Sequence, residues 1–331
     1  MKSSISPAAL AGLILLGGCA ANTPAVPTAT SATSGARSPV RDAATRQSGG
    51  SLTQLVNLDY SSGTISVFSI SKKRAHVTKS FAPGHGVAQG LAMDAQGRIY
   101  TTISSANSKP CAACVEIFTP TGRLVKRLPA PILPGAPGSP SLTDISVDSG
   151  RNVYVSDYGQ QAVYFFPHAG KAQQPQIVVQ NSQNAASVLA TPDGSTVVVS
   201  GGCGFASVRP YTRQSSGSYT AGACFGIGTI ALIGGALDDQ IDVMTPVDGV
   251  PGLVSISSPS GGGSFNTPGH LASISGVAYN SDASVAYVAN ARKECVYAFA
   301  RPAQGWLSGA QPKLLETYAG FKHLDIIAVA H

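Results

Sequence analysis

Short apolar runs separated by polar turns recur along the chain from about residue 51 to its end. Each copy is an apolar strand, a polar turn and a second strand with aromatic or β-branched residues at its centre, a pattern that predicts a β-hairpin. Four copies are clear, at 90–103, 144–157, 187–201 and 276–290. Their starts lie 54, 43 and 89 residues apart. The last interval is about twice the others, so we expect a degenerate copy at 229–246.

Each hairpin is followed by a third strand and, in most copies, by a fourth. The third strands are expected in "CVEIFTP", "AVYFFPH", "ASVRPYT", "GLVSISS" and "CVYAFAR", and the fourth in "LVKRLP", "QIVVQ", "SYTAGAC" and "KLLETYAG". Four antiparallel strands in a unit of about 45 residues are typical of a β-propeller blade.

The two ends of this region supply one further unit between them. Residues 54–82 form a unit without its first strand, and residues 323–331 form a first strand without the rest. Joined, they complete a sixth blade and remove an exposed sheet edge. The sequence therefore predicts an all-β, six-bladed β-propeller over residues 51–331, with an N- to C-terminal clasp that closes blade one.

Three of the units align without gaps across the loop from the second to the third strand. This alignment places Asp59, Asp157 and Asn290 at one equivalent position. The third unit, "DISVDSGRNVYVSDYGQQAVYFF", resembles NHL repeats, and the region as a whole is similar to the six-bladed group that contains the gluconolactonases and senescence-marker lactonases. The resemblance implies the fold, and a binding face where the loops meet around the central channel.

The lactonase resemblance also implies a divalent metal, held by Glu, Asn and Asp side chains at the beginning of the innermost strands. The matching positions here are Gln89, Thr143, Ala186 and Ser275, none of which is a carboxylate. A hard divalent cation prefers several oxygen ligands that include charged ones. This mismatch favours a binding module over an enzyme.

A rival hypothesis rests on three histidines, His85, His270 and His323, which fall on connections between neighbouring blades. Three imidazoles can bind zinc and leave a fourth position for water, and this set is similar to that in the propeller of the peptide-amidating lyases. The alternative function is therefore a metal-dependent lactonase- or lyase-type enzyme, although the metal is not identified by the sequence. Under either hypothesis the candidate binding face comprises Asp59, Asp144, Asp157, Asn290, Asp325 and Gln89.

The N-terminus has the pattern of an export signal. Met1 and Lys2 precede the apolar run "AALAGLILL", which is too short to span a bilayer. The following "LGGC" resembles the lipobox of bacterial lipoproteins. The resemblance implies a signal peptide at 1–18, a lipidated Cys19 and anchoring to the cell envelope, and Ala20 favours the outer membrane. Residues 19–50 then form a disordered tether, because they contain almost no large apolar side chain.

Composition limits the classes of partner that we expect, and the cysteines indicate which disulfides form. Only 11% of the 331 residues are charged, and half of the formal charge of +6 lies before residue 51, which argues against nucleic acid. We expect a small molecule, a peptide or an envelope protein instead. Export implies an oxidising compartment. Cys203–Cys224 is the preferred disulfide, Cys111 and Cys114 are a second candidate pair, and Cys295 is expected to be a buried thiol.

Overall fold

The computed structural model describes residues 52–83, 87–104, 113–169, 174–180, 182–183, 185–201, 203, 207–227, 235–247, 252–268, 274–280 and 282–329. The chain divides into two compact units, residues 1–45 and 46–331, and every described residue lies in the second. Strands dominate the described part of this unit, which also contains the 3-10 helices η1 (Pro167–Ala169) and η2 (Trp306–Ser308). The prediction of an all-β fold is therefore confirmed. In the described part, no helix is long and apolar enough to cross a membrane.

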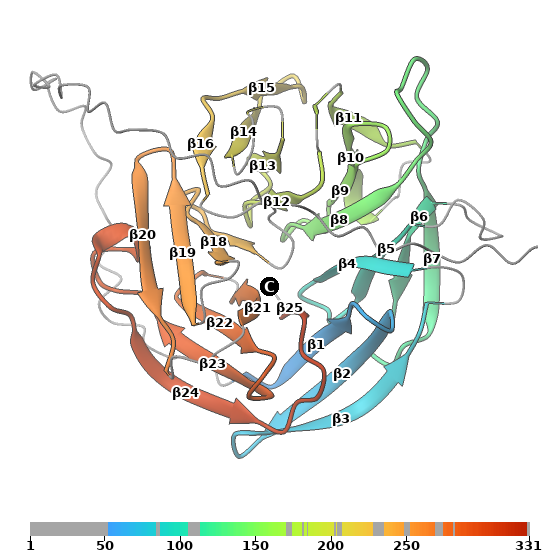
Figure 1. Ribbon diagram of the computed structural model, residues 1–331. Helices are drawn as coiled ribbons and strands as arrows, with labels where there is room; N and C mark the ends of the chain where they lie inside the picture. The colour runs from blue at the N-terminus through green and yellow to red at the C-terminus, as the bar shows by residue number, and fades with distance from the viewer. Residues whose placement is uncertain are drawn as a thin grey trace, which may run out of the picture. The chain divides into compact units, whose positions relative to one another are not determined.

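The strands form sets of four, which we call blades and give from the innermost strand outwards (Figure 1). Blade one is β25 (Ile326–Ala328), β1 (Gln54–Asp59), β2 (Thr64–Ser71) and β3 (Arg74–Phe81). Blade two is β4 (Val87–Met93), β5 (Ile99–Ser104), β6 (Ala113–Phe118) and β7 (Leu124–Pro129). Blade three is β8 (Leu142–Val147), β9 (Val153–Asp157), β10 (Ala162–Phe166) and β11 (Gln176–Val179).

The second half of the chain continues the pattern. Blade four is β12 (Val188–Ala190), β13 (Thr196–Ser200), β14 (Ser207–Arg213) and β15 (Tyr219–Ala221), and a short β16 (Phe225–Gly226) also pairs with β14. Blade five is β17 (Ala236–Leu237), β18 (Val243–Pro246), β19 (Leu253–Ser258) and β20 (Gly261–Asn266). Blade six is β21 (Ile274–Tyr279), β22 (Val285–Asn290), β23 (Cys295–Ala300) and β24 (Lys313–Ala319).

Blade one contains strands from both ends of the described chain. β25 pairs antiparallel with β1, so that Val56 lies opposite Ala328. At the outer edge, β3 of blade one meets β24 of blade six in a single parallel pairing between Arg74 and Ala319. Blades one and six therefore form one eight-stranded sheet, which Figure 1 shows as a continuous band.

Apolar side chains pack between neighbouring blades. Leu58 of blade one packs in one cluster with Leu91 of blade two, and each following pair of blades has a cluster of its own. The last cluster brings Phe68 of blade one together with Tyr287 of blade six. Burial of apolar area is therefore distributed around the whole circle of sheets, and the first and last blades pack against each other like the others.

A polar side chain holds the hairpin between the first and second strands. Asp94 accepts a hydrogen bond from the backbone N–H of Arg98 at 2.9 Å, and Asp148 accepts one from that of Asn152 at 2.8 Å. Asp238 accepts one from the backbone N–H of Asp242 at 2.8 Å. These aspartates form tight turns, as their side chains favour.

A second repeated contact holds the first strand against its neighbour in blades one to four. The backbone N–H of Gly90 donates to Thr102 Oγ1 at 2.8 Å, and that of Asp144 donates to Ser156 Oγ at 3.0 Å. In β4 and β8 the pairing register shifts close to these residues. The buried hydroxyl groups satisfy backbone donors that the strand ladder leaves free. Ser200 and Asn57 make the same contact in blades four and one.

Blade five departs from the predicted pattern in its outer strand. No fourth strand was predicted there, yet Gly261–Asn266 pairs with β19 along six residues. The sequence "GGGSFN" lacks the β-branched and alternating apolar residues on which strand prediction relies. Its pairing follows from its position beside β19 and not from its own propensity.

Candidate functional site

Different connections between strands lie at the two ends of each blade. The loop from the second to the third strand and the connection into the next blade lie at one end, which we call the loop face. The hairpins after the first and third strands lie at the opposite end, the turn face. Leu52, the first described residue, leads into β1 at the turn face. The loop face is therefore the side away from the point where the N-terminal segment joins.

The central channel is narrow, and apolar side chains together with strand backbone line it. It forms a cavity of about 70 Å³, lined by the first strands of all the blades, with Leu91, Ile145 and Leu237 among the lining residues. This volume holds a few water molecules but is small beside the roughly 300 Å³ of the smallest usual ligand pockets. Among the described residues that line the channel, a ligand of ordinary size therefore finds no room.

Asp59, Asp157 and Asn290 occupy one equivalent position, the last residue of the second strand in blades one, three and six. Each closes the turn that follows it. Asp157 Oδ1 accepts from the backbone N–H of Gln160 at 3.0 Å, and Asn290 Oδ1 accepts from that of Lys293 at 3.0 Å. The alignment thus identified a real structural equivalence, and the role of these side chains is to shape loops.

These three residues differ in burial, which decides whether each side chain can contact a partner. Asp157 and Asn290 are fully buried, whereas Asp59 is half-buried. Burial would raise the pKa of Asp59, but hydrogen bonds from Ser61 and Ser62 outweigh it and lower that pKa below its ordinary value. Asp157 and Asn290 therefore cannot touch a partner directly while their loops are closed.

Asp144 links two blades at the edge of the channel. Its Oδ1 accepts from the backbone N–H of Ile145 at 2.9 Å, and its Oδ2 accepts from that of Val188 in blade four at 3.1 Å. The side chain is buried, and burial raises its pKa to about 7 despite the two hydrogen bonds. Asp144 therefore holds blade three against blade four, with its carboxyl group inside the protein.

Asp325 and Gln89 lie half-buried on the loop face. Asp325 Oδ2 accepts from the backbone N–H of Tyr60 at 2.9 Å. His323 is exposed, with its carbonyl oxygen bound to the side-chain amide of Asn57 at 2.8 Å. His85 and His270 lie outside the described residues, so the predicted histidine triad cannot be placed. Within the described ranges, no group of three or more His, Cys, Asp or Glu side chains could hold a metal.

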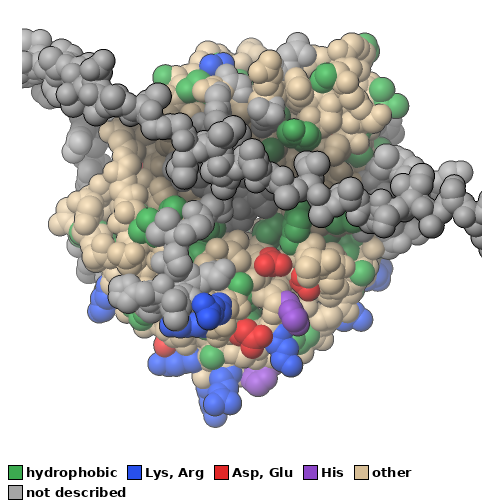
Figure 2. Space-filling view, in the orientation of Figure 1, with side chains coloured by type: hydrophobic (Ala, Val, Ile, Leu, Met, Phe, Trp, Pro, Cys, Tyr) green, Lys and Arg blue, Asp and Glu red, His purple; other side chains and the backbone are tan. Residues whose placement is uncertain are grey.

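The loop face also exposes apolar side chains that the sequence analysis did not single out. Tyr60, Val87 and Tyr158 are each about half exposed, at 47%, 50% and 51%, and Ile132 is 85% exposed. All four lie in second-to-third-strand loops, in a connection between blades or at the beginning of β4. We call these four residues the apolar patch. Figure 2 shows hydrophobic side chains close to acidic ones on the side of the molecule that it views.

Contacts between blades one, two and three link the segments that carry the members of the apolar patch. Gly63, in the loop of Tyr60, faces the backbone of Ala88, next to Val87, and Val87 lies opposite Ser104 in the β4–β5 ladder. Ser104 Oγ lies 3.0 Å from Ser141 Oγ, and the backbone N–H of Tyr158 donates to the carbonyl of Ser141 at 3.0 Å.

Ile132 is joined to the same loop through Gln160. The side chain of Gln160 accepts from the backbone N–H of Leu133 and donates to the carbonyl of Pro131, both at 2.7 Å. The two residues that flank Ile132 are thus bound to the loop of Tyr158. Sequence reasoning missed this surface because the exposure of a tyrosine or isoleucine in a loop depends on the tertiary fold.

The cysteines of blade four form a disulfide. Cys203 and Cys224, the preferred pair, are bonded with their Cα atoms 5.9 Å apart. Cys203 lies in the loop that follows the second strand of blade four. A disulfide therefore holds this loop, whereas hydrogen bonds to Asp157 and Asn290 hold the corresponding loops of blades three and six. Cys114 is also disulfide-bonded, while Cys111 lies outside the described residues. Cys295 is a buried free thiol, which agrees with the prediction.

Comparison with known proteins shows the fold. No protein-family profile matches the chain, and no curated protein is significantly similar to it in sequence. Among solved structures, the Nidogen/Laminin complex matches with a TM-score of 0.55 and 15% identity, over 84% of this chain and 98% of that one. A functionally unknown protein from Desulfotomaculum acetoxidans matches with a TM-score of 0.52 and 14% identity, over 84% and 86%.

Virginiamycin B lyase from Staphylococcus aureus is also similar, with a TM-score of 0.44, 12% identity and 69% of each chain covered. At this level the likeness carries no argument about activity. The strand pairing and the first two structures together define the class: the chain is an all-β protein of the β-propeller type.

Proposed function

We propose that this protein is a lipoprotein of the bacterial cell envelope that binds an envelope protein through the apolar patch of its loop face. The observation that carries the proposal is the exposure of four apolar side chains on linked segments of the loop face, Tyr60, Val87, Ile132 and Tyr158. Contiguous exposed apolar surface is typical of interaction sites. Tyrosines are enriched in such sites, because each ring contributes a large contact area and a polar group.

Hydrogen bonds hold the loops below the patch in place, which favours tight binding. Tyr158 follows Asp157, whose Oδ2 accepts from the hydroxyl of Tyr164 at 3.0 Å and from the side chain of Gln160 at 2.9 Å. The backbone of Tyr60 is bound to Asp325. The free energy of binding is therefore reduced little by the cost of ordering these loops.

The envelope location rests on the N-terminal sequence. The apolar run and "LGGC" around Cys19 support lipidation there, and the polar residues 20–50 support a tether. Leu52 joins the propeller at the turn face, opposite the apolar patch. This arrangement leaves the patch on the side away from the attachment of the tether.

The proposal is tested by site-specific cross-linking in intact cells. A photoreactive amino acid replaces Val87, and its cross-linked partner is identified and quantified by mass spectrometry. We expect the paired substitution Tyr60→Ser and Tyr158→Ser to reduce the cross-linked product about tenfold or more, because it removes two aromatic anchors. The thermal midpoint of the purified variant should stay close to that of the wild type, since both side chains are about half exposed.

The matched control is Ile177→Ser. Ile177 is 45% exposed on β11, at the outer edge of blade three and outside the patch. Equal loss of the cross-linked product with this control, or no loss with the tyrosine pair, would show that the patch does not bind the partner.

The same purified protein separates this function from the metal-dependent lactonase or lyase alternative. One zinc per chain, lost on His85→Ala, would favour the enzyme and overturn the binding proposal. We expect that the metal content does not change in His85→Ala and that the cross-link is lost in the tyrosine pair.

A further inference from the structure

We propose that the Cys203–Cys224 disulfide is a thiol–disulfide exchange site, at which a dithiol reductant opens the loop face of blade four. The proposal rests on an arginine placed against one of the two sulfurs and on the exposure of that sulfur's residue. It concerns blade four and is independent of the apolar patch on blades one to three.

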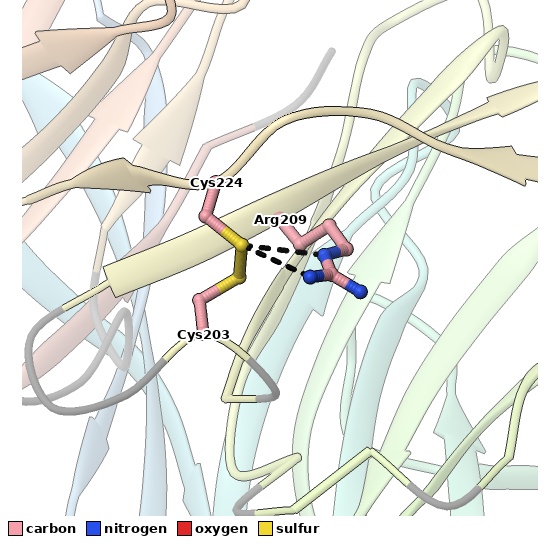
Figure 3. Close-up of a disulfide and its surroundings, with 3 residues drawn as sticks. All are labelled: Cys203, Arg209 and Cys224. Carbon is pink, nitrogen blue, oxygen red and sulfur yellow. Dashed lines mark hydrogen bonds between the residues drawn. A yellow bond between two sulfur atoms is a disulfide. The ribbon is translucent and has the colours of Figure 1, made fainter.

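The guanidinium group of Arg209 is directed at Cys224 (Figure 3). Its Nε and Nη2 atoms donate to Cys224 Sγ at 3.3 and 3.2 Å. Arg209 lies on β14, beside the strands that the disulfide joins, and has no carboxylate partner in the described part of the chain. Cys224 is exposed and Cys203 is half-buried. The more exposed cysteine of the disulfide is thus the one that carries a cation at its sulfur.

This placement determines which sulfur leaves. When a thiolate attacks a disulfide, the sulfur with the lower thiol pKa leaves faster, and a neighbouring cation lowers that pKa. The incoming thiolate therefore bonds to Cys203 Sγ, the bond between the two cysteines breaks, and the electron pair leaves on Cys224 Sγ beside Arg209. The mixed disulfide joins the first sulfur of the reductant to Cys203 Sγ. The second thiol of the reductant, as its thiolate, then attacks that first sulfur and releases the Cys203 thiolate. The reductant ends as a disulfide and blade four as a dithiol.

Reduction would loosen a weakly held strand. β16 pairs with β14 through only two residue pairs, Ser207 with Gly226 and Val208 with Phe225. The residue before β16 is Cys224, so the disulfide anchors this strand covalently. β16 also contacts β19 of blade five. The redox state of the disulfide is thus coupled to the boundary between blades four and five.

The rate of reduction tests the role of Arg209. Native protein is incubated with dithiothreitol, alkylated at intervals and digested, and the Cys203 and Cys224 peptides are quantified by mass spectrometry. We expect Arg209→Gln to slow reduction about tenfold, and Arg209→Lys to stay within about threefold of the wild type. Reduction of the disulfide of Cys114, read in the same digest, should be unchanged by either substitution.

A second measurement needs no variant. Brief treatment of the wild-type protein with glutathione, a monothiol, leaves a mixed disulfide whose position is read by mass spectrometry. We expect the adduct on Cys203. An adduct mainly on Cys224, equal reduction rates in Arg209→Gln and wild type, or reduction that occurs only as the propeller unfolds would each overturn the proposal.

Discussion

At the scale of single residues, Asp144 is a carboxylic acid inside the protein without a cationic partner in the described part of the chain. Burial raises its pKa from 3.8 to about 7. Between these values the folded protein holds a proton that the unfolded chain releases. The contribution of Asp144 to stability is therefore fully present below about pH 4 and is lost as the pH rises to about 7.

Replacing Asp144 by Asn should flatten the pH dependence of stability. The free energy of unfolding, measured in urea from pH 4 to 8, should fall less steeply in Asp144→Asn than in the wild type, by up to about 1.4 kcal/mol per pH unit. Burial and the charge of Asp238 also raise the pKa of Asp242 to about 7, so some slope should persist. Parallel curves for the two proteins would contradict the assignment.

At this scale the sequence predicted which residues are equivalent but not what their side chains do. The equivalence of Asp59, Asp157 and Asn290 followed from the repeat, because a shared backbone position needs a shared side-chain acceptor. Their roles did not follow, because the sequence does not show that Asp157 is fully buried. The disulfide of Cys203 was accessible to reasoning from strand order alone, whereas the neighbouring Arg209 was not, since its contact depends on side-chain direction across β14.

At the scale of elements, neighbouring blades approach closely where the first strands β4 and β21 contain glycines. A Cβ atom built on Gly276 of β21 would lie 2.6 Å from the carbonyl oxygen of Asp325, just before β25. One built on Gly90 of β4 would lie 2.8 Å from the Cα atom of Asp144. Both contacts are with backbone, which cannot move aside as a flexible side chain does. The absence of a side chain at these positions is therefore a condition of close blade packing.

The substitution Gly276→Ala should destabilise the protein by roughly 2 kcal/mol, the cost typical of overpacking. The matched control is Gly263→Ala in β20, where nothing lies within 4 Å of the added Cβ atom. We expect the control to change the free energy of unfolding by less than about 0.5 kcal/mol. Equal effects of the two substitutions, measured by urea unfolding, would show that contact with β25 is not the cause.

Elements with a repeated pattern were predictable, and those without one were not. The four clear hairpins lie where the alternation of apolar and polar residues placed them. β20 was missed because three of its six residues are glycine, and β16 because two residues give no period. In both cases the strand forms through its neighbour, a tertiary cause that local sequence does not contain.

At the scale of the whole molecule, stability depends on the contact between the two ends of the described chain. The cluster between blades one and six includes Phe68 and Phe321, whose ring centroids lie 5.0 Å apart. β25 supplies the innermost strand of blade one. Without it, β1 would present a free edge beside the channel.

Deletion of residues 323–331 should therefore abolish cooperative unfolding of the propeller. We expect a broad thermal transition and dye binding to exposed apolar surface, because blade one loses its innermost strand and two clusters lose residues. Addition of a synthetic 323–331 peptide should restore a cooperative transition. A truncated protein that unfolds as sharply and at the same temperature as the full chain would show that β25 is dispensable.

The pairing of Val56 with Ala328 has a consequence for the time at which the protein acquires its structure. Contacts so distant along the chain form late, since a very long loop must close before they contribute. A nascent chain that has left the ribosome as far as blade five still lacks the strand that completes blade one. Blade one therefore becomes complete only after the five other blades have been synthesised, because its innermost strand, β25, follows all of them in the chain.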